Sequence, residues 1–300
     1  MSLPTTITEY LDQLKAELAS ADPALVQDAL SDAEEYLRSE LAAHPREGEA
    51  ALLARIASSY GRPSEVADIY RDTEATVVRA LRPPPPPPRS SLFGRFFGVA
   101  ADPRAWSALI YMLLSLLTGI FYFTWAATGI ALSVGLSITV VGVLFFLLFM
   151  ATVRVLSLVE GRIVEVMLGE RMPRRPAYPP PADGFFSRIG QLLSDPRTWG
   201  TLLYQVLMLP LGMVYFIVAV TGLSIGATLT ATPIFALLGL GELQLGDVGG
   251  VAFGSVIGTP IVLLLCLLGV GILFGTLHLA RGVAHVHGAL AKQLLVTWGD

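Results

Sequence analysis

Three of the four histidines lie close together near the end of the chain, at His278, His285 and His287. On a helix, His278 and His285 share one face, and Arg281 lies between them. Imidazole is a common metal ligand, but a metal site needs a third convergent ligand, and no carboxylate lies nearby in the sequence. Packed or headgroup-facing histidines are therefore the favoured interpretation, and we expect no metal site and no cofactor.

No other grouping of residues predicts catalysis. Cys266, the single cysteine, lies in an apolar run, which excludes a disulfide framework and the cysteine-rich metal motifs. The neighbouring acids Glu34 and Glu35 suit a solvated helix surface. The sequence shows neither a nucleophile suitably spaced from a base nor a glycine-rich phosphate loop. We therefore expect that the protein is not an enzyme.

An acidic helix face is the first candidate binding surface. From Pro23 to Leu41, apolar side chains recur at helical spacing, and four charged residues lie away from that apolar stripe. The four are Asp28, Asp32, Glu35 and Arg38. We expect the packed core to leave this face uncovered, so that it can dock a basic protein partner through complementary charge.

The segment 227–252 is the second candidate, because it is apolar yet too short to cross a membrane twice. We expect it to lie against the outer leaflet or over the mouth of a helical bundle, where it would contact a hydrophobic or lipid-like ligand. A plain connecting loop is an equally weighted alternative. Its candidate ligand residues are Thr232, Pro233, Phe235, Glu242 and Asp247.

The composition predicts the elements that position these residues. Charged residues make up 15% of the 300, below the roughly 25% of globular domains, and 53% are apolar. Residues 1–82 hold 15 acids and 8 bases, a net charge of −7, which argues against direct nucleic-acid binding. Nearly uncharged runs follow Arg104 and Arg197, and each exceeds the ~20 residues of one membrane-spanning helix. This predicts an all-α protein with an N-terminal helical domain and a multi-span membrane domain.

Residues 1–82 predict a small domain of four short helices. Thr6 begins a capping-box pattern, and Asp22 before Pro23 is typical of a second helix start. A third helix is expected to end at Gly61, and Pro63 then begins the fourth.

A polyproline linker, residues 83–90, follows this domain. Its unbroken proline run predicts a semi-rigid spacer between the two domains. A docking site for an aromatic-grooved adaptor is the less favoured alternative.

Residues 91–300 contain an internal repeat, with copies at about 91–170 and 184–300. The first part of each copy matches at an offset of 93 positions, and the last part at an offset of 127. The matched pairs include Asp102 with Asp195, Trp106 with Trp199, Tyr111 with Tyr204, Gly119 with Gly212, Tyr122 with Tyr215, Arg154 with Arg281 and Gly161 with Gly288. Such same-direction repeats predict a pseudo-two-fold axis along the membrane normal.

Each copy is expected to supply two spans, which gives four in total. We place them at 105–129, 133–157, 199–226 and 253–279. As bounded, these spans hold no acid, which disfavours ion-coupled transport, because transporters generally need an intramembrane acid.

Basic residues predict the orientation. They gather before the first span, between the second and third, and after the fourth, and none lies in the two other loops. By the positive-inside rule, both termini are cytoplasmic and the protein is a multi-pass protein of the cell membrane. Arg104 with Trp106 and Arg197 with Trp199 are expected to be interfacial anchors.

The N-terminal domain resembles a known family. Segments 10–14 (YLDQL) and 32–37 (DAEEYL) are similar to the front of the HAAS signalling domain, and segment 60–70 (YGRPSEVADIY) to its closing turn and helix. Tyr60 stands where that family usually has leucine. HAAS domains are associated with bacterial membrane signalling and with PadR-like transcriptional regulators. The resemblance therefore implies a cytoplasmic protein partner of that kind.

The membrane domain resembles the "putative sensor" domain of bacterial membrane proteins. The resemblance rests on segment 111–129, its second copy at 209–216 (LPLGMVYF), and segment 159–169. That family is often coupled to histidine kinases, and this chain has no kinase region, so the resemblance implies an output through the N-terminal domain or a partner.

These observations favour an integral membrane sensor that relays a membrane or envelope signal to a cytoplasmic partner, such as a PadR-like regulator. A small membrane transporter or channel is the alternative. Membrane lipids are the other expected partners, and glycines four residues apart, as at Gly222 and Gly226, allow a homo-oligomer.

Overall fold

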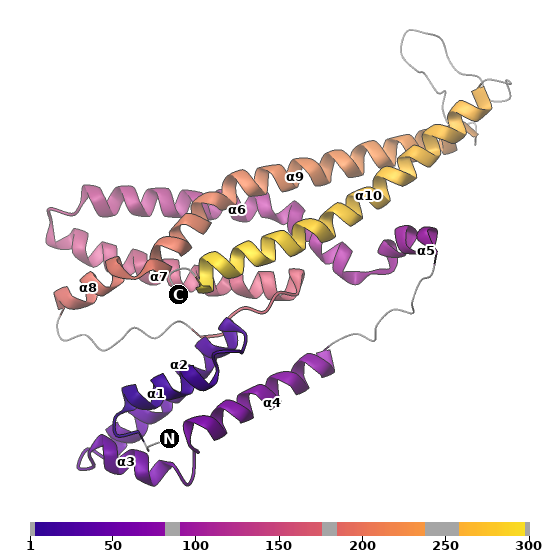
Figure 1. Cartoon of the computed structure of the whole chain (residues 1–300). Helices are drawn as coiled ribbons and strands as arrows, with labels where there is room; N and C mark the ends of the chain where they lie inside the picture. Colours follow the sequence, from indigo (N-terminus) through magenta and orange to yellow (C-terminus); the bar gives the residue numbers. More distant parts are fainter. Residues whose placement is uncertain (1–3, 82–90, 176–184, 238–257, 298–300) are drawn as a thin grey trace.

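The computed structural model describes residues 4–81, 91–175, 185–237 and 258–297 (Figure 1). In these ranges the regular elements are all helical, which confirms the predicted all-α class. Four helices are long and apolar enough to cross a membrane, as predicted. They are α6 (Pro103–Gly135), α7 (Val140–Leu168), α9 (Pro196–Leu237) and α10 (Gly258–Lys292). The predicted polyproline linker, residues 83–90, lies outside the described residues.

The N-terminal domain holds four helices around one apolar core. They are α1 (Ile7–Glu17), α2 (Pro23–Ala43), α3 (Glu49–Ile56) and α4 (Pro63–Leu81). Thr6 caps α1 by accepting a hydrogen bond from the Glu9 backbone N–H at 3.1 Å, and Asp22 caps α2 in the same way. Leu14, Leu37 and Leu52 are fully buried, and truncating such a side chain costs about 2–5 kcal/mol.

A π-helical segment, η3 (Gln293–Thr297), directly follows α10. Three further short elements lie before α6 and α9. These are α5 (Leu92–Phe97), the 3₁₀ turn η1 (Gly98–Ala101) and α8 (Phe185–Ser194). They precede α6 and α9, in front of the two Asp-Pro-Arg-x-Trp motifs. The predicted anchors Trp106 and Trp199 are about half exposed, and each indole N–H donates to a backbone carbonyl six residues earlier, at 2.8 Å.

The long helices extend further than the sequence pattern predicted. The turn between α6 and α7 lies at Leu136–Thr139 rather than near Ser133, and α7 runs to Leu168, where Gly169 ends it at φ +78°. Glu160 therefore lies inside the candidate span Val141–Leu168. The prediction ended the second span at residue 157; the longer candidate span includes Glu160 and Glu165, so the absence of an acid holds only for the shorter bounds.

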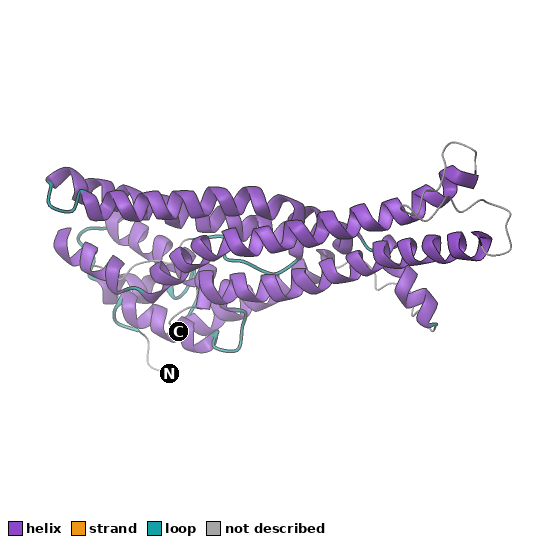
Figure 2. Cartoon of the chain, turned by 90° about the horizontal axis from the view of Figure 1, so that it is seen from above, coloured by secondary structure: helices purple, strands orange, loops and turns teal. Residues whose placement is uncertain are grey.

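The two repeats meet where α6 crosses α9, and the two helices run in opposite directions there (Figure 1). Gly119 faces the carbonyl of Met208, and Gly212 faces that of Ser115. Later residues of one helix thus oppose earlier residues of the other. Because glycine has no Cβ, the two backbones approach closely at this crossing. The turn ends of the helix pairs α6–α7 and α9–α10 consequently lie at opposite ends of the bundle (Figure 2).

This antiparallel crossing differs from the arrangement that the same-direction repeats predicted. An axis along the membrane normal requires the N-terminal ends of α6 and α9 on one side of the bundle, whereas Figure 1 shows them at opposite ends. Which side of the membrane each turn faces stays a prediction from the basic residues.

Residues that match between the repeats make matching contacts across the crossing. Arg154 of the first copy pairs with Asp195 of the second at 3.7 Å, and Arg281 of the second pairs with Asp102 of the first at 3.4 Å. Each ion pair thus joins the second helix of one repeat to the entry of the other repeat's first helix.

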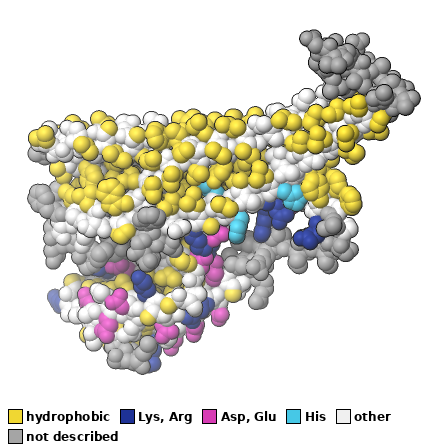
Figure 3. All heavy atoms as spheres, turned by 45° about the horizontal axis from the view of Figure 1, so that its top comes forward, with side chains coloured by type: hydrophobic (Ala, Val, Ile, Leu, Met, Phe, Trp, Pro, Cys, Tyr) yellow, Lys and Arg dark blue, Asp and Glu magenta, His cyan; other side chains and the backbone are white. Residues whose placement is uncertain are grey.

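Hydrophobic side chains cover the long helices, and charged side chains gather on the N-terminal domain and beside it (Figure 3). Leu117, Leu144 and Leu267 are each about 70% exposed. Contiguous apolar surface of this extent is unusual for a soluble protein and suits contact with lipid.

Candidate functional site

Four tyrosines, one glutamate and one histidine form a buried group where the four long helices meet; we call it the polar cluster. Glu160 of α7 is 1% exposed and His287 of α10 is fully buried. The Glu160 carboxylate accepts from Tyr111 (2.9 Å), Tyr204 (2.8 Å) and Tyr122 (2.9 Å). The His287 Nε2 atom lies 2.7 Å from the Tyr111 hydroxyl and 3.0 Å from that of Tyr204, and its Nδ1 atom lies 3.3 Å from that of Tyr215.

Every hydrogen bond of the polar cluster can be satisfied at once. Three tyrosine hydroxyls donate to the Glu160 carboxylate, the Nε2–H of His287 is shared by the oxygens of Tyr111 and Tyr204, and Tyr215 donates to Nδ1. A buried carboxylate without such donors costs several kcal/mol. The cluster can therefore hold one charge inside the bundle, or pass a proton between carboxylate and imidazole through a shared hydroxyl.

The polar cluster follows the repeat residue by residue. Tyr111 matches Tyr204 and Tyr122 matches Tyr215 at the offset of 93, and Glu160 matches His287 at the offset of 127. Sequence reasoning paired the tyrosines but missed the glutamate and the histidine as partners. The sequence does contain this pairing, because the offset that pairs Arg154 with Arg281 also pairs Glu160 with His287.

The three C-terminal histidines do not converge. His287 belongs to the polar cluster, His278 contacts the carbonyl of Phe96 at 3.0 Å, and His285 is exposed. Among the residues that the structure describes, no three His, Cys, Asp or Glu side chains are placed to hold a metal ion.

The acidic face of α2 is covered by another part of the chain, the basic segment 171–175 that follows α7. The Asp28 carboxylate accepts from the backbone N–H groups of Arg174 (2.6 Å) and Arg175 (3.0 Å). The Arg175 guanidinium pairs with Asp32 at 2.9 Å and with Glu35 at 3.1 Å. The expectation that this face is uncovered is therefore wrong for Asp28, whereas the Glu35 side chain is still 68% exposed. Whether a partner docks there stays a prediction.

The fourth residue predicted for the acidic face, Arg38, pairs with Glu34 on α2 at 2.8 Å. Asp28 itself is only 6% exposed. Burial raises the pKa of the Asp28 carboxyl, and the two backbone N–H groups with the Arg171 guanidinium, 3.4 Å away, oppose that rise.

Further ion pairs fasten the N-terminal domain to the long helices. Arg171 also pairs with Glu74 of α4. Lys292, the last residue of α10, bridges Asp22 at 2.6 Å and Glu170 at 2.8 Å. The domain is thus held both at the end of α7 and at the end of α10.

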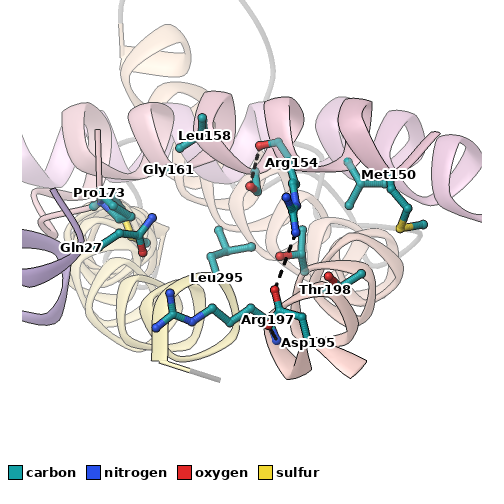
Figure 4. Close-up of a pocket in the computed structure, with 14 residues that line it drawn as sticks. Gln27, Met150, Arg154, Leu158, Gly161, Pro173, Asp195, Arg197, Thr198 and Leu295 are labelled. Atoms are coloured by element: carbon teal, nitrogen blue, oxygen red, sulfur yellow. Dashed lines mark hydrogen bonds and ion pairs between the residues drawn. The ribbon is translucent and has the colours of Figure 1, made fainter. Parts of the chain in front are cut away.

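A pocket lies between α7, the start of α9 and the N-terminal domain (Figure 4). Arg154 points across it toward Asp195, and Arg197 and Leu295 lie on its opposite wall. The predicted anchor Arg197 therefore lines a pocket. Its counterpart Arg104 is exposed at the start of α6. The remaining lining includes Gln27, Met150, Val153, Ser157, Leu158, Thr198 and Thr201.

The candidate ligand segment 227–252 is helical in its first part, because α9 continues to Leu237. Thr232 and Phe235 are exposed and Pro233 is buried in the last turns of that helix. Glu242 and Asp247 lie outside the described residues. The structure brings none of the three described residues into the polar cluster or the pocket.

The fold and its apolar surface define an all-helical membrane protein with four candidate spans. Residues 111–295 match the model of the family described as "Putative sensor", and the chain belongs to that family. No curated protein and no solved structure matched the chain. The resemblance of the first 80 residues to the HAAS domain stays a prediction.

Proposed function

We propose that this protein is a membrane sensor whose N-terminal domain is cytoplasmic and passes the signal to a basic protein partner, such as a PadR-like transcriptional regulator. Membership of a sensor family supports a signalling role rather than a catalytic one. One observation supports the proposed output through the N-terminal domain. The acidic face of α2 is bound by the basic segment 171–175, which directly continues α7.

This contact suggests how a change in the bundle reaches the partner. Helix α7 carries Glu160 of the polar cluster and continues into Arg171 and Arg175, which hold the acidic face. A shift of α7 would therefore loosen or tighten the basic segment. The segment occupies the face that a basic partner would use, so partner and segment compete for it.

The experiment compares partner capture by full-length variants in membranes. The Arg175→Glu change should raise capture of a PadR-like regulator several-fold, because it turns the pairing with Asp32 and Glu35 into repulsion, weakens the hold of segment 171–175, and leaves the acidic face in place. The double change Asp32→Lys with Glu35→Lys should lower capture, and added salt should lower capture by the wild type. The exposed pair Asp12→Lys with Asp72→Lys is a matched charge control. Equal capture by all four proteins would refute the acidic face as the docking surface.

The transporter alternative gains one supporting observation, the position of Glu160 inside a candidate span. Glu160, Tyr111 and His287 together could relay a proton. Proton flux in liposomes that carry the purified protein tests this alternative. Flux that disappears in Glu160→Gln would favour transport, and absence of flux in the wild type would favour the sensor.

A further inference from the structure

The basic segment 171–175 is held on the acidic face of α2 through its backbone as well as through its charge. The N–H groups of Arg174 and Arg175 both donate to one carboxylate oxygen of Asp28, at 2.6 and 3.0 Å. The carbonyl of Arg175 accepts from the side-chain amide of Gln27 at 2.7 Å. Two adjacent side chains of α2 thus bind both the donors and an acceptor of this short stretch of backbone, as peptide-binding surfaces do.

Only one of the two arginine side chains lies on the acidic face. The Arg175 guanidinium pairs with Asp32 at 2.9 Å and with Glu35 at 3.1 Å. The Arg174 guanidinium instead turns back toward α7, where it lies 3.6 Å from Glu165. The face therefore contacts an arginine side chain at the second of the two positions and only a backbone N–H at the first.

The chain's own segment does not satisfy this surface completely. The Oε1 atom of Gln27 is buried and has no hydrogen-bond partner among the described residues. The segment is also fixed from the other side, because Met172 is fully buried in one apolar cluster with Val164 of α7 and Met208 of α9. The bundle thus positions the segment, and another occupant has a hydrogen bond to gain that this segment does not make.

A partner that displaces the segment must replace its hydrogen bonds. Asp28 is 6% exposed, and a buried carboxylate that loses its donors costs several kcal/mol. The backbone N–H groups of a folded helix or sheet are already paired, so a folded basic surface offers few of them. An extended segment offers consecutive free N–H groups, and an arginine in it supplies a planar guanidinium with several donors for neighbouring carboxylates.

We propose that the acidic face of α2 recognises an extended, arginine-containing segment of its protein partner, bound in the place and manner of residues 174–175. The first position requires a backbone N–H, which excludes proline but no other residue, and the second position requires arginine. The identity of the partner rests on the proposed function, whereas recognition of such a segment is tested without that partner.

The test measures binding of fluorescent peptides to the purified full-length protein by anisotropy. The reference peptide copies residues 172–175 (MPRR) with both ends blocked. Because proline precedes Arg174, only the Arg174–Arg175 register presents two N–H groups followed by an arginine side chain. Three altered peptides carry Arg174→Ala, which keeps the N–H, N-methylation of Arg174, which removes only the N–H, or Arg175→Lys, which keeps the charge without the guanidinium.

The peptides are offered to the wild type and to a freed protein with Arg174→Pro and Arg175→Glu. The freed protein's own segment lacks one N–H donor and both ion pairs with the acidic face. Arg175→Ala is a second, milder freed protein, and circular dichroism checks that each variant keeps its helical content. Adding Asp32→Lys with Glu35→Lys to the freed protein removes the acidic face, and adding Asp12→Lys with Asp72→Lys instead is the matched charge control.

We expect the reference peptide to bind the freed protein about tenfold more tightly than the wild type, whose tethered segment competes at a high effective concentration. Arg174→Ala should bind within about threefold of the reference, whereas N-methylation should weaken binding about tenfold, as loss of a hydrogen bond to a charged group does. Arg175→Lys should weaken it about fivefold. Removal of the acidic face should abolish binding, and the charge control should retain it.

Equal binding of the reference, N-methylated and Arg175→Lys peptides would mean attraction by charge alone and would overturn the proposal. Absence of binding, or equal binding to the wild type and the freed protein, would overturn it too. If partner capture fails while the peptides bind as expected, the proposed partner is wrong and the recognition stands. If capture succeeds while the peptides show no selectivity, the partner stands and the extended segment is wrong.

Discussion

Glu160 and His287, which stand at matching positions of the two repeats, are bridged by the same two hydroxyl groups, those of Tyr111 and Tyr204. The four residues come from α6, α7, α9 and α10, one from each long helix. The two repeats therefore share one hydrogen-bonded network at their interface. A change in the protonation or position of Glu160 alters the hydrogen bonds that the two tyrosines can make to His287, and the reverse also holds.

The first prediction concerns Glu160→Gln. The neutral amide keeps one acceptor oxygen but replaces the other with a donor, so all three tyrosine hydroxyls lose a charged partner and at least one of them loses its acceptor. Hydrogen bonds to charged groups contribute about 1.5–3 kcal/mol each, and thermal unfolding in detergent should occur several degrees lower. Glu165→Gln on the same helix, where Glu165 is partly exposed and pairs with Arg162 and Arg174, should change the midpoint less. Equal shifts for both variants would contradict a central role for Glu160.

The second prediction concerns the crossing of α6 and α9. A methyl group at Gly119 would overlap the Met208 carbonyl, and one at Gly212 would overlap that of Ser115. Because both obstacles are backbone atoms, each Gly→Ala change should separate the helices and lower the unfolding midpoint. Gly275→Ala, with no atom within 4 Å of the added group, should be neutral or stabilising by at most about 1 kcal/mol. If Gly119→Ala and Gly275→Ala have the same unfolding midpoint, the close contact of α6 with α9 at Gly119 is contradicted.

The third prediction concerns orientation, which the sequence alone supports. In a chain without Cys266, a cysteine at exposed Ser137, in the turn between α6 and α7, should react with an impermeant reagent added outside the cell. The basic residues predict that a cysteine at Gly241 reacts from the same side. The structure, which places the turn ends of α6–α7 and α9–α10 at opposite ends of the bundle, predicts reaction from the other side. Residues 1–104, 158–198 and 281–300 should be protected until the membrane is opened. Labelling of the two turns from opposite sides would replace the four-span arrangement with an inverted one.

The fourth prediction concerns pH and Asp28. Burial raises the pKa of Asp28 above its ordinary value, so the folded protein retains this proton to a higher pH than the unfolded chain does. The stability from this residue is fully present below the ordinary pKa and is lost as pH rises through the raised value. The unfolding midpoint of the wild type relative to Asp28→Asn should therefore fall as pH increases from about 4. A relative midpoint that rises over that range would show that the N–H groups and Arg171 outweigh burial.

Local patterns predicted the helices well because capping and apolar spacing act within a few residues. Thr6 and Asp22 begin helices as expected. Helix α3, however, ends at Ile56 rather than at Gly61, which has a φ of +108° and lies in the short link to α4. The span limits were less accurate, because α7 continues past residue 157 through mostly apolar residues that include Glu160, which is buried against other helices. Glu160 shows this: its burial depends on tyrosines 38 and 49 positions away. The covering of Asp28 by segment 171–175 likewise depends on contacts about 147 residues apart, which no local spacing encodes.

The attachment of the N-terminal domain has a mechanical consequence. Arg171 follows the end of α7 in the first repeat, and Lys292 ends α10 in the second, so the domain is tied to both repeats at once. The N-terminal domain is therefore fixed at two points. Movement of both repeats together leaves its ion pairs undisturbed, whereas spreading or twisting one repeat against the other pulls on Asp22 and Asp28 in different directions. If the domain reports the state of the bundle as proposed, this attachment makes it respond to spreading or twisting of one repeat against the other, and not to displacement of the bundle as a whole.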